Sequence, residues 1–143
     1  MTSLAFVDVV GAGLDPTPAA MVAKPTLLLL HGGPGFDHSG FRPFFDRFAD
    51  THQVVLYDHR GNGRSDGWDN PSNWNLDRWA DDVVALCEAL GIERPVVLGQ
   101  SFGGFVAQLG GSYRYESEGG TRFVMEFPAM AASPAEQGAL SWS

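Results

Sequence analysis

The chain has 143 residues, enough for one domain with a single hydrophobic core. Its net charge is −8, from 17 acidic and 9 basic residues, which argues against nucleic acid or an anionic membrane surface as the main partner. A single cysteine excludes an internal disulfide and a cysteine-based metal site, and no apolar run could span a bilayer, so we expect a cytoplasmic protein without metal or cofactor.

Short apolar runs predict the strands of a buried parallel sheet. They lie at residues 26–30, 54–57 and 96–98, and a cluster of glycine and polar residues follows each of them. An N-terminal segment from Leu4 to Val10 could add one more strand. A run that is apolar on both faces is typical of a buried parallel strand.

Amphipathic segments between the runs predict helices. Phenylalanines recur at helical spacing over residues 41–49. The clearest helix begins after Asn75, a suitable N-cap, and ends before Gly91; its apolar stripe leaves Asp81, Asp82 and Glu88 off the buried face. Residues 102–109 also have a helical pattern. Strands that alternate with helices indicate an α/β fold, with a mostly parallel sheet and helices on both faces.

The sequence Gly99-Gln-Ser101-Phe-Gly103 lies between the third apolar run and the helix that follows it. A serine on so sharp a turn would project its hydroxyl above the sheet, and side chains at the flanking positions would collide with backbone. A chance match in a glycine-rich chain is the alternative. Because the strand and helix are both in place, we interpret Ser101 as a nucleophile.

The sequence His31-Gly32-Gly33-Pro34-Gly35 follows the first run. Glycines allow the main chain to approach a bound carbonyl, so the N–H groups of Gly33 and Phe102 could form an oxyanion hole. The other interpretation is a tight turn. We expect the His31 side chain to fix this loop by hydrogen bonding and not to act as a general base.

The third cluster, Asp58-His-Arg60-Gly-Asn-Gly-Arg-Ser65, follows the second run. We interpret Asp58 and Arg60 as structural residues that hold a loop by charge-assisted hydrogen bonds. Phosphate binding is an alternative, but no Gly-Lys-Ser/Thr pattern supports it. All three clusters follow predicted parallel strands, and ligands bind at that edge of an open α/β sheet.

The three clusters, in this order and at this spacing, resemble those of the α/β-hydrolase superfamily, and most closely its proline iminopeptidase-like branch. The resemblance covers residues 4–109 and implies that the runs ending at Leu30, Tyr57 and Leu98 are the family's third, fourth and fifth strands. It implies Ser101 as the nucleophile and Gly33 and Phe102 as the oxyanion hole, with Gly99, Gly103, His31, Gly32, Gly35, Asp58 and Arg60 in structural roles. The substrate implied is a small molecule or short peptide.

The chain departs from the family where the triad is completed. The family's catalytic triad occurs along the chain in the order serine, then acid, then histidine. In this sequence no histidine follows His59 and no aspartate follows Asp82. We therefore interpret residues 1–143 as one partial domain, truncated or altered after about residue 109, whose open sheet edge would allow self-association. We expect it to be inactive, unless His38, His59 or a partner chain supplies the base.

Residues 110–143 differ in composition from the rest, with no Asp, His or Lys. Residues 122–127 could form a fourth parallel strand, and a loop would follow Pro128. Either this is a genuine sixth strand in the family's count before an early end, or the segment is not native and comes from a shifted reading frame.

Two further functions are open to the same sequence. The incomplete triad would permit a non-catalytic module that binds a ligand in the hydrolase pocket, although mere binding needs neither the serine turn nor an oxyanion loop. Residues 9–13 hint at a nucleotide-binding Gly-x-Gly, but Pro16 replaces the third glycine and no helix pattern follows.

Overall fold

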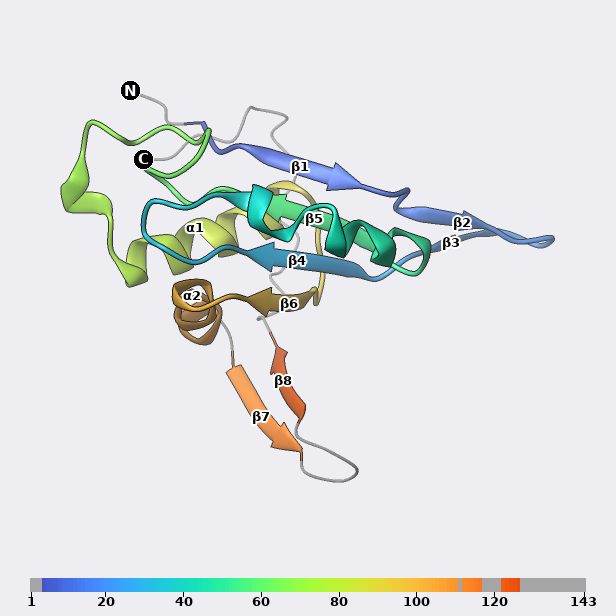
Figure 1. Cartoon of the computed structure of the whole chain (residues 1–143). Coiled ribbons are helices and arrows are strands. Elements are labelled where there is room, and N and C mark those ends of the chain that lie inside the picture. The colour runs from blue at the N-terminus through green and yellow to red at the C-terminus, as the bar shows by residue number, and fades with distance from the viewer. Residues whose placement is uncertain (1–3, 111, 117–121, 127–143) are drawn as a thin grey trace.

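The computed structural model describes residues 4–110, 112–116 and 122–126. Four strands form its central sheet, in the order β1 (Val7–Val10), β5 (Gln53–Tyr57), β4 (Thr26–Leu30) and β6 (Val96–Gly99) (Figure 1). β4 pairs in parallel with both β5 and β6, whereas β1 pairs antiparallel with β5. The three predicted parallel strands are therefore confirmed, and the N-terminal strand forms with the opposite direction.

Two α-helices cover one face of the sheet. They are α1 (Leu76–Ala89) and α2 (Phe102–Gly110), and both pack against alternate residues of the central strands. Leu28 and Leu30 point to this face and are fully buried. The predicted cap is confirmed, because the Asn75 side chain accepts a hydrogen bond of 2.9 Å from the Arg78 N–H.

The other face is covered by short helices, where the sequence predicted one helix over residues 41–49. Two 3₁₀ helices form instead, η1 (His38–Phe41) and η2 (Phe44–Asp50), and a third, η3 (Pro71–Asn73), precedes α1. Leu27 and Leu29 of β4 point to this side and pack with Phe41. A spacing of three residues, as between Phe41 and Phe44, suits a 3₁₀ helix as well as an α-helix, so the pattern does not fix the helix type. It also overstated the buried side, because Phe41 is buried but Phe44 is 60% exposed.

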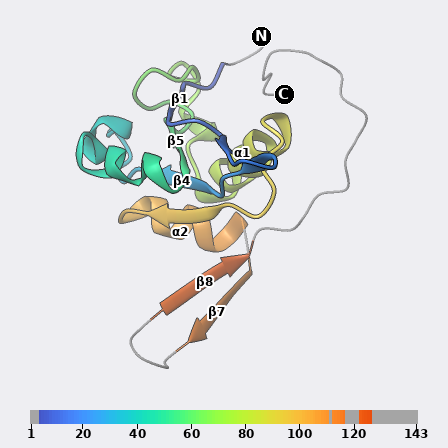
Figure 2. The same cartoon turned by 90° about the vertical axis from the view of Figure 1, so that its right-hand side faces the viewer.

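Two antiparallel hairpins lie outside the central sheet. One joins β2 (Leu14–Pro16) to β3 (Met21–Ala23), and the other joins β7 (Ser112–Glu116) to β8 (Arg122–Glu126) (Figures 1 and 2). The prediction that residues 122–127 add a parallel strand is therefore wrong, because β8 pairs with its own chain neighbour in a separate two-stranded sheet. The loop predicted after Pro128 lies outside the described residues.

No helix in the described ranges is both long enough and apolar enough to cross a membrane. Within the same ranges, α1 is the longest helix, with 14 residues.

Candidate active site

Ser101 lies on the turn that joins β6 to α2, and its side chain is exposed. Its φ angle is +52°, in the left-handed region that a non-glycine residue rarely adopts. The turn is held by hydrogen bonds of 2.9 Å from Gly103 N–H to Gln100 O and from Gly104 N–H to Ser101 O. A strained serine is thus fixed at the carboxyl end of a central strand.

The glycines on either side of Ser101 are required by contact with backbone. A Cβ on Gly99 would lie 2.4 Å from the carbonyl carbon and oxygen of Gly103. A Cβ on Gly103 would lie 2.2 Å from Leu30 O and 2.6 Å from His31 O. These separations are well inside van der Waals contact, so the start of α2 can pack against the end of β4 only without side chains here.

The loop at residues 31–35 packs directly against the serine turn. A Cβ on Gly32 would lie 3.3 Å from Ser101 Cβ and 3.1 Å from Gln100 O. Gly33 has a φ angle of +123° and Gly35 of +99°, values suited to glycine. The structure therefore brings together two of the three motifs, at Gly32 and Ser101.

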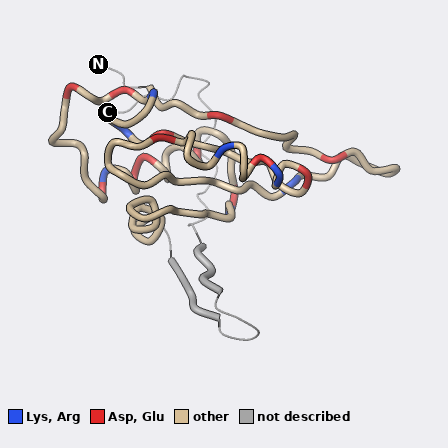
Figure 3. Tube along the Cα trace, in the orientation of Figure 1, with Lys and Arg blue, Asp and Glu red and all other residues tan. Residues whose placement is uncertain are grey.

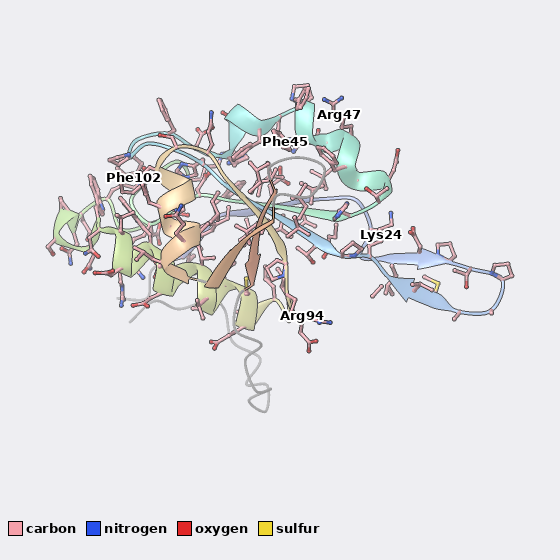
Figure 4. The ribbon with its side chains drawn as sticks, turned by 90° about the horizontal axis from the view of Figure 1, so that it is seen from below. Lys24, Phe45, Arg47, Arg94 and Phe102 are labelled. Atoms are coloured by element: carbon pink, nitrogen blue, oxygen red, sulfur yellow. The ribbon has the colours of Figure 1, made fainter. Side chains whose placement is uncertain are left out.

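The two backbone N–H groups that the sequence assigns to an oxyanion hole belong to Gly33, in the 31–35 loop, and Phe102, next to Ser101. Within the described ranges, neither Gly33 N–H nor Phe102 N–H donates a hydrogen bond. Phe102 is the first residue of α2, at the positive end of the helix dipole (Figure 4). α2 carries no charged residue of its own (Figure 3). These groups could donate to a negatively charged oxygen.

The loop at residues 58–65 holds the 31–38 segment through side chains. Asp58 is fully buried, and its Oδ1 accepts hydrogen bonds from His38 N–H at 2.7 Å and His38 Nδ1 at 2.8 Å. Its Oδ2 accepts one of 2.9 Å from Arg64 N–H. Asn62 adds a bond from Gly35 N–H to its Oδ1 at 2.5 Å. The third motif therefore contacts the first.

Arg60 anchors the same loop to α1. Its Nε and Nη2 donate to the two oxygens of Asp82 at 2.8 and 2.7 Å, and both side chains are almost completely buried. The prediction that Asp82 lies off the buried face is wrong. A carboxylate can occupy an apolar helix face here because the guanidinium neutralises it and satisfies both oxygens.

His31 and His59 form a reciprocal pair between the two loops. His59 N–H donates to His31 Nε2 at 3.0 Å, and His59 Nε2 lies 3.2 Å from His31 O. His31 Nδ1 lies 2.6 Å from Gly32 O. Both rings are buried, and burial lowers the pKa of His59 to about 3 and also lowers that of His31. Both imidazoles are neutral at pH 7.

The neutral state of His59 predicts acid sensitivity. An unfolded histidine has a pKa near 6.5, so between pH 6.5 and about 3 the unfolded chain binds a proton that the folded chain does not. The stability contributed by a neutral His59 is complete above pH 6.5 and is lost as pH falls. Between pH 6.5 and 5, the titration of His59 alone should lower the free energy of unfolding by about 2 kcal/mol.

Urea unfolding at pH 7 and pH 5 measures this loss. The wild-type chain should lose about 2 kcal/mol more than His59→Phe, which keeps a ring and cannot bind a proton. An equal loss of unfolding free energy in the two chains would contradict a neutral, buried His59.

Sequence reasoning missed the partners that hold the loops. His38, His59 and Asn62 contact residues that lie 20 to 28 positions away, which no local pattern reveals. The neighbouring glycines signalled a loop but not its partner. In the described part of the chain, no histidine hydrogen-bonds the Ser101 hydroxyl, and the residues named as possible bases, His38 and His59, are engaged with Asp58 and His31.

Residues 25–109 match the family described as the alpha/beta hydrolase fold. The proline iminopeptidase of Clostridium botulinum (strain Hall) is 34% identical over 110 residues, which are 77% of this chain and 37% of that protein. The proline iminopeptidase of Clostridioides difficile (strain 630) is 40% identical over 85 residues, which are 59% of this chain and 29% of that protein. The chain thus spans about a third of the length of these curated relatives.

Solved structures of similar proteins also include proline iminopeptidases and their relatives. The proline iminopeptidase-related protein from Thermus thermophilus superposes with a TM-score of 0.63 at 33% identity, over 74% of this chain and 35% of that one. The proline iminopeptidase of Mycobacterium smegmatis gives a TM-score of 0.62 at 34% identity, over 76% of this chain and 36% of that one.

Proposed function

The chain belongs to the α/β hydrolase family, and from this premise we propose that it carries the nucleophile of a cytoplasmic serine hydrolase. The reaction proposed is hydrolysis of an ester, an amide or an amino-terminal peptide bond through an acyl-enzyme. The observation that carries the proposal is Ser101, held at φ +52° on the strand-to-helix turn with the 31–35 loop against it. The names of the relatives support a short peptide as substrate.

In the proposed reaction, Ser101 Oγ attacks the carbonyl carbon of the substrate. The carbonyl oxygen becomes negative and accepts hydrogen bonds from Gly33 N–H and Phe102 N–H, which have no other acceptor in the described ranges. The amino terminus of α2 stabilises the same charge. When the tetrahedral intermediate collapses, the bond to the leaving group breaks, and the leaving group takes up the proton that a base removed from Ser101. Water then attacks the ester on Ser101, which releases the acid and returns a proton to the serine oxygen.

Removal of the Ser101 proton requires a base. No histidine hydrogen-bonds Ser101 in the described ranges, and the printed sequence has none after His59. Without an oriented base the serine is a weak nucleophile at neutral pH. We therefore propose that the 143-residue chain alone is inactive or nearly so.

Labelling with a fluorophosphonate probe, with and without imidazole, tests whether Ser101 is the nucleophile and whether the chain alone is inactive. In buffer alone, Ser101 should not be labelled stoichiometrically. Added imidazole should act as a diffusible base and produce labelling at Ser101, identified by peptide mass, that is lost in Ser101→Ala. The other serine and tyrosine hydroxyls of the chain report non-specific labelling, and imidazole should increase their labelling less than that of Ser101.

Two outcomes would overturn the proposal in different ways. Imidazole that gives no labelling at Ser101 would contradict its role as a nucleophile. Rapid labelling without imidazole would contradict the proposed inactivity and would mean that His38, His59 or a second chain supplies the base.

A further inference from the structure

Gly32 lies between two peptide planes, and each plane is held by one histidine ring. The plane before it carries His31 O, which lies 3.2 Å from His59 Nε2. The plane after it carries Gly32 O, which lies 2.6 Å from His31 Nδ1. Both rings are buried. The two rings together therefore set the φ and ψ angles of Gly32.

Gly32 has little room for a side chain, because the serine turn lies against it. A Cβ would lie 3.3 Å from Ser101 Cβ and 3.1 Å from Gln100 O, tighter than ordinary contact, so glycine fits best here. Glycine is also the residue with the greatest backbone freedom. The close approach to the serine turn thus favours a flexible residue at position 32, and hydrogen bonds from neighbouring groups can supply the rigidity that a side chain would otherwise give.

The hydrogen bonds assign the proton on each ring. His31 Nε2 accepts from His59 N–H, so the His31 proton lies on Nδ1 and is donated to Gly32 O. His59 Nε2 faces the carbonyl oxygen of His31 and must donate, so His59 is protonated on Nε2. His59 Nδ1 is buried and has no hydrogen-bond partner in the described residues. The two neutral rings are therefore opposite tautomers.

The plane after Gly32 also contains the Gly33 N–H. Because this peptide is trans and planar, fixing the Gly32 carbonyl fixes the N–H of Gly33 in the opposite direction. The His31 carbonyl, in turn, lies against the start of α2, since a Cβ on Gly103 would be 2.6 Å from it. His59 thus restrains the atom at which the 31–35 loop and the serine turn meet.

We propose that His59 is a positioning residue for the Gly33 N–H: its ring holds the His31 carbonyl while the His31 ring holds the Gly32 carbonyl. The catalytic meaning of this arrangement rests on the proposed function, in which Gly33 N–H binds the oxyanion. The arrangement itself does not depend on that function and can be measured in the free chain.

The first test reads the protons directly. Long-range ¹H–¹⁵N correlation spectra of the full chain at pH 7 distinguish protonated from unprotonated ring nitrogens. The expected result is a protonated Nδ1 in His31 and a protonated Nε2 in His59. The same tautomer in both rings, or a charged ring in either, would overturn the proposal even if no variant folds.

The second test removes the donor and then restores it. His59→Phe keeps a ring among its aromatic neighbours and lacks the donor, whereas His59→Gln carries an amide nitrogen at about the reach of Nε2. In His59→Phe, the backbone order parameters of Gly32 and Gly33 should fall from about 0.85, typical of rigid backbone, to below about 0.6. In His59→Gln they should return towards the wild-type value, and strands β4 and β5 should stay rigid in both variants.

Order parameters for Gly32 and Gly33 that stay at the rigid value in His59→Phe would refute the role of His59. The result is separable from the proposed function. If these residues loosen as expected but Ser101 fails to react with the fluorophosphonate in imidazole, the positioning stands and the nucleophile assignment falls. If Ser101 reacts and the order parameters do not change, the nucleophile assignment stands and the positioning role of His59 falls.

Discussion

Gly103→Ala is expected to destabilise the chain by about 3 kcal/mol or more, or to prevent folding. The added methyl would meet Leu30 O at 2.2 Å and His31 O at 2.6 Å. Both atoms belong to backbone, and Leu30 O already accepts a hydrogen bond of 3.0 Å from Gln100 N–H. Neither can move without separating β4 from the turn, so the overlap cannot be relieved by a side-chain rotation.

The neighbouring glycine provides a matched control. A Cβ on Gly104 would lie 3.5 Å from Gly99 O, which is an ordinary contact. Alanine favours a helix interior over glycine by roughly 0.5–1 kcal/mol, so Gly104→Ala should be neutral or stabilising. Urea unfolding of both variants measures the contrast. Equal stabilities would show that α2 does not pack against β4 as described.

The second large effect is expected at the buried ion pair of Arg60 and Asp82. Asp82→Ala should destabilise the chain by about 3–5 kcal/mol, because it leaves a buried guanidinium without the carboxylate that faces two of its nitrogens. The double change Arg60→Met with Asp82→Leu removes both charges and fills similar volume. It should be more stable than the single variant, since the almost completely buried Arg60 guanidinium is gone. Arg78, whose Nε lies 3.9 Å from Asp82 Oδ1, loses the same carboxylate in both variants and so does not affect the comparison.

An exposed pair serves as the comparison. Asp46 accepts hydrogen bonds from Arg42, and the side chains are 28% and 38% exposed. Asp46→Ala should therefore change stability by no more than about 1 kcal/mol. Urea unfolding of all three chains gives the values. A loss at Asp82 as small as that at Asp46 would mean that the Arg60 anchor is solvated and contributes little.

The central sheet and its helices could be predicted because their signals are local. A continuous apolar run such as residues 26–30 is a strand that is buried on both faces, and the structure divides its leucines between two separate apolar clusters. The glycine spacing around Ser101 predicted a sharp turn for the same reason: only glycine tolerates backbone at contact distance. Family membership followed from these motifs and was confirmed by the comparisons.

The features that the sequence did not predict depend on contacts between residues far apart in the chain, or lack a local pattern. The β2–β3 hairpin gave no apolar alternation because its residues are exposed on both strands. Asp82 looked like a surface residue until Arg60, 22 positions earlier in the chain, was placed beside it. The tautomers of His31 and His59 follow only from which backbone atoms face each nitrogen. Residue types alone carry none of this information.

The fold is expected to make Ser101 a better nucleophile than an ordinary serine. The most direct test of this claim is the rate of imidazole-dependent fluorophosphonate labelling at Ser101 in the folded chain and in the same chain unfolded by urea. Oxyanion donors alone retain large rate effects when a triad is disabled, and one donor can contribute roughly 10²–10³. The folded chain should therefore react at least about tenfold faster. Equal or slower labelling of the folded chain would contradict the claim.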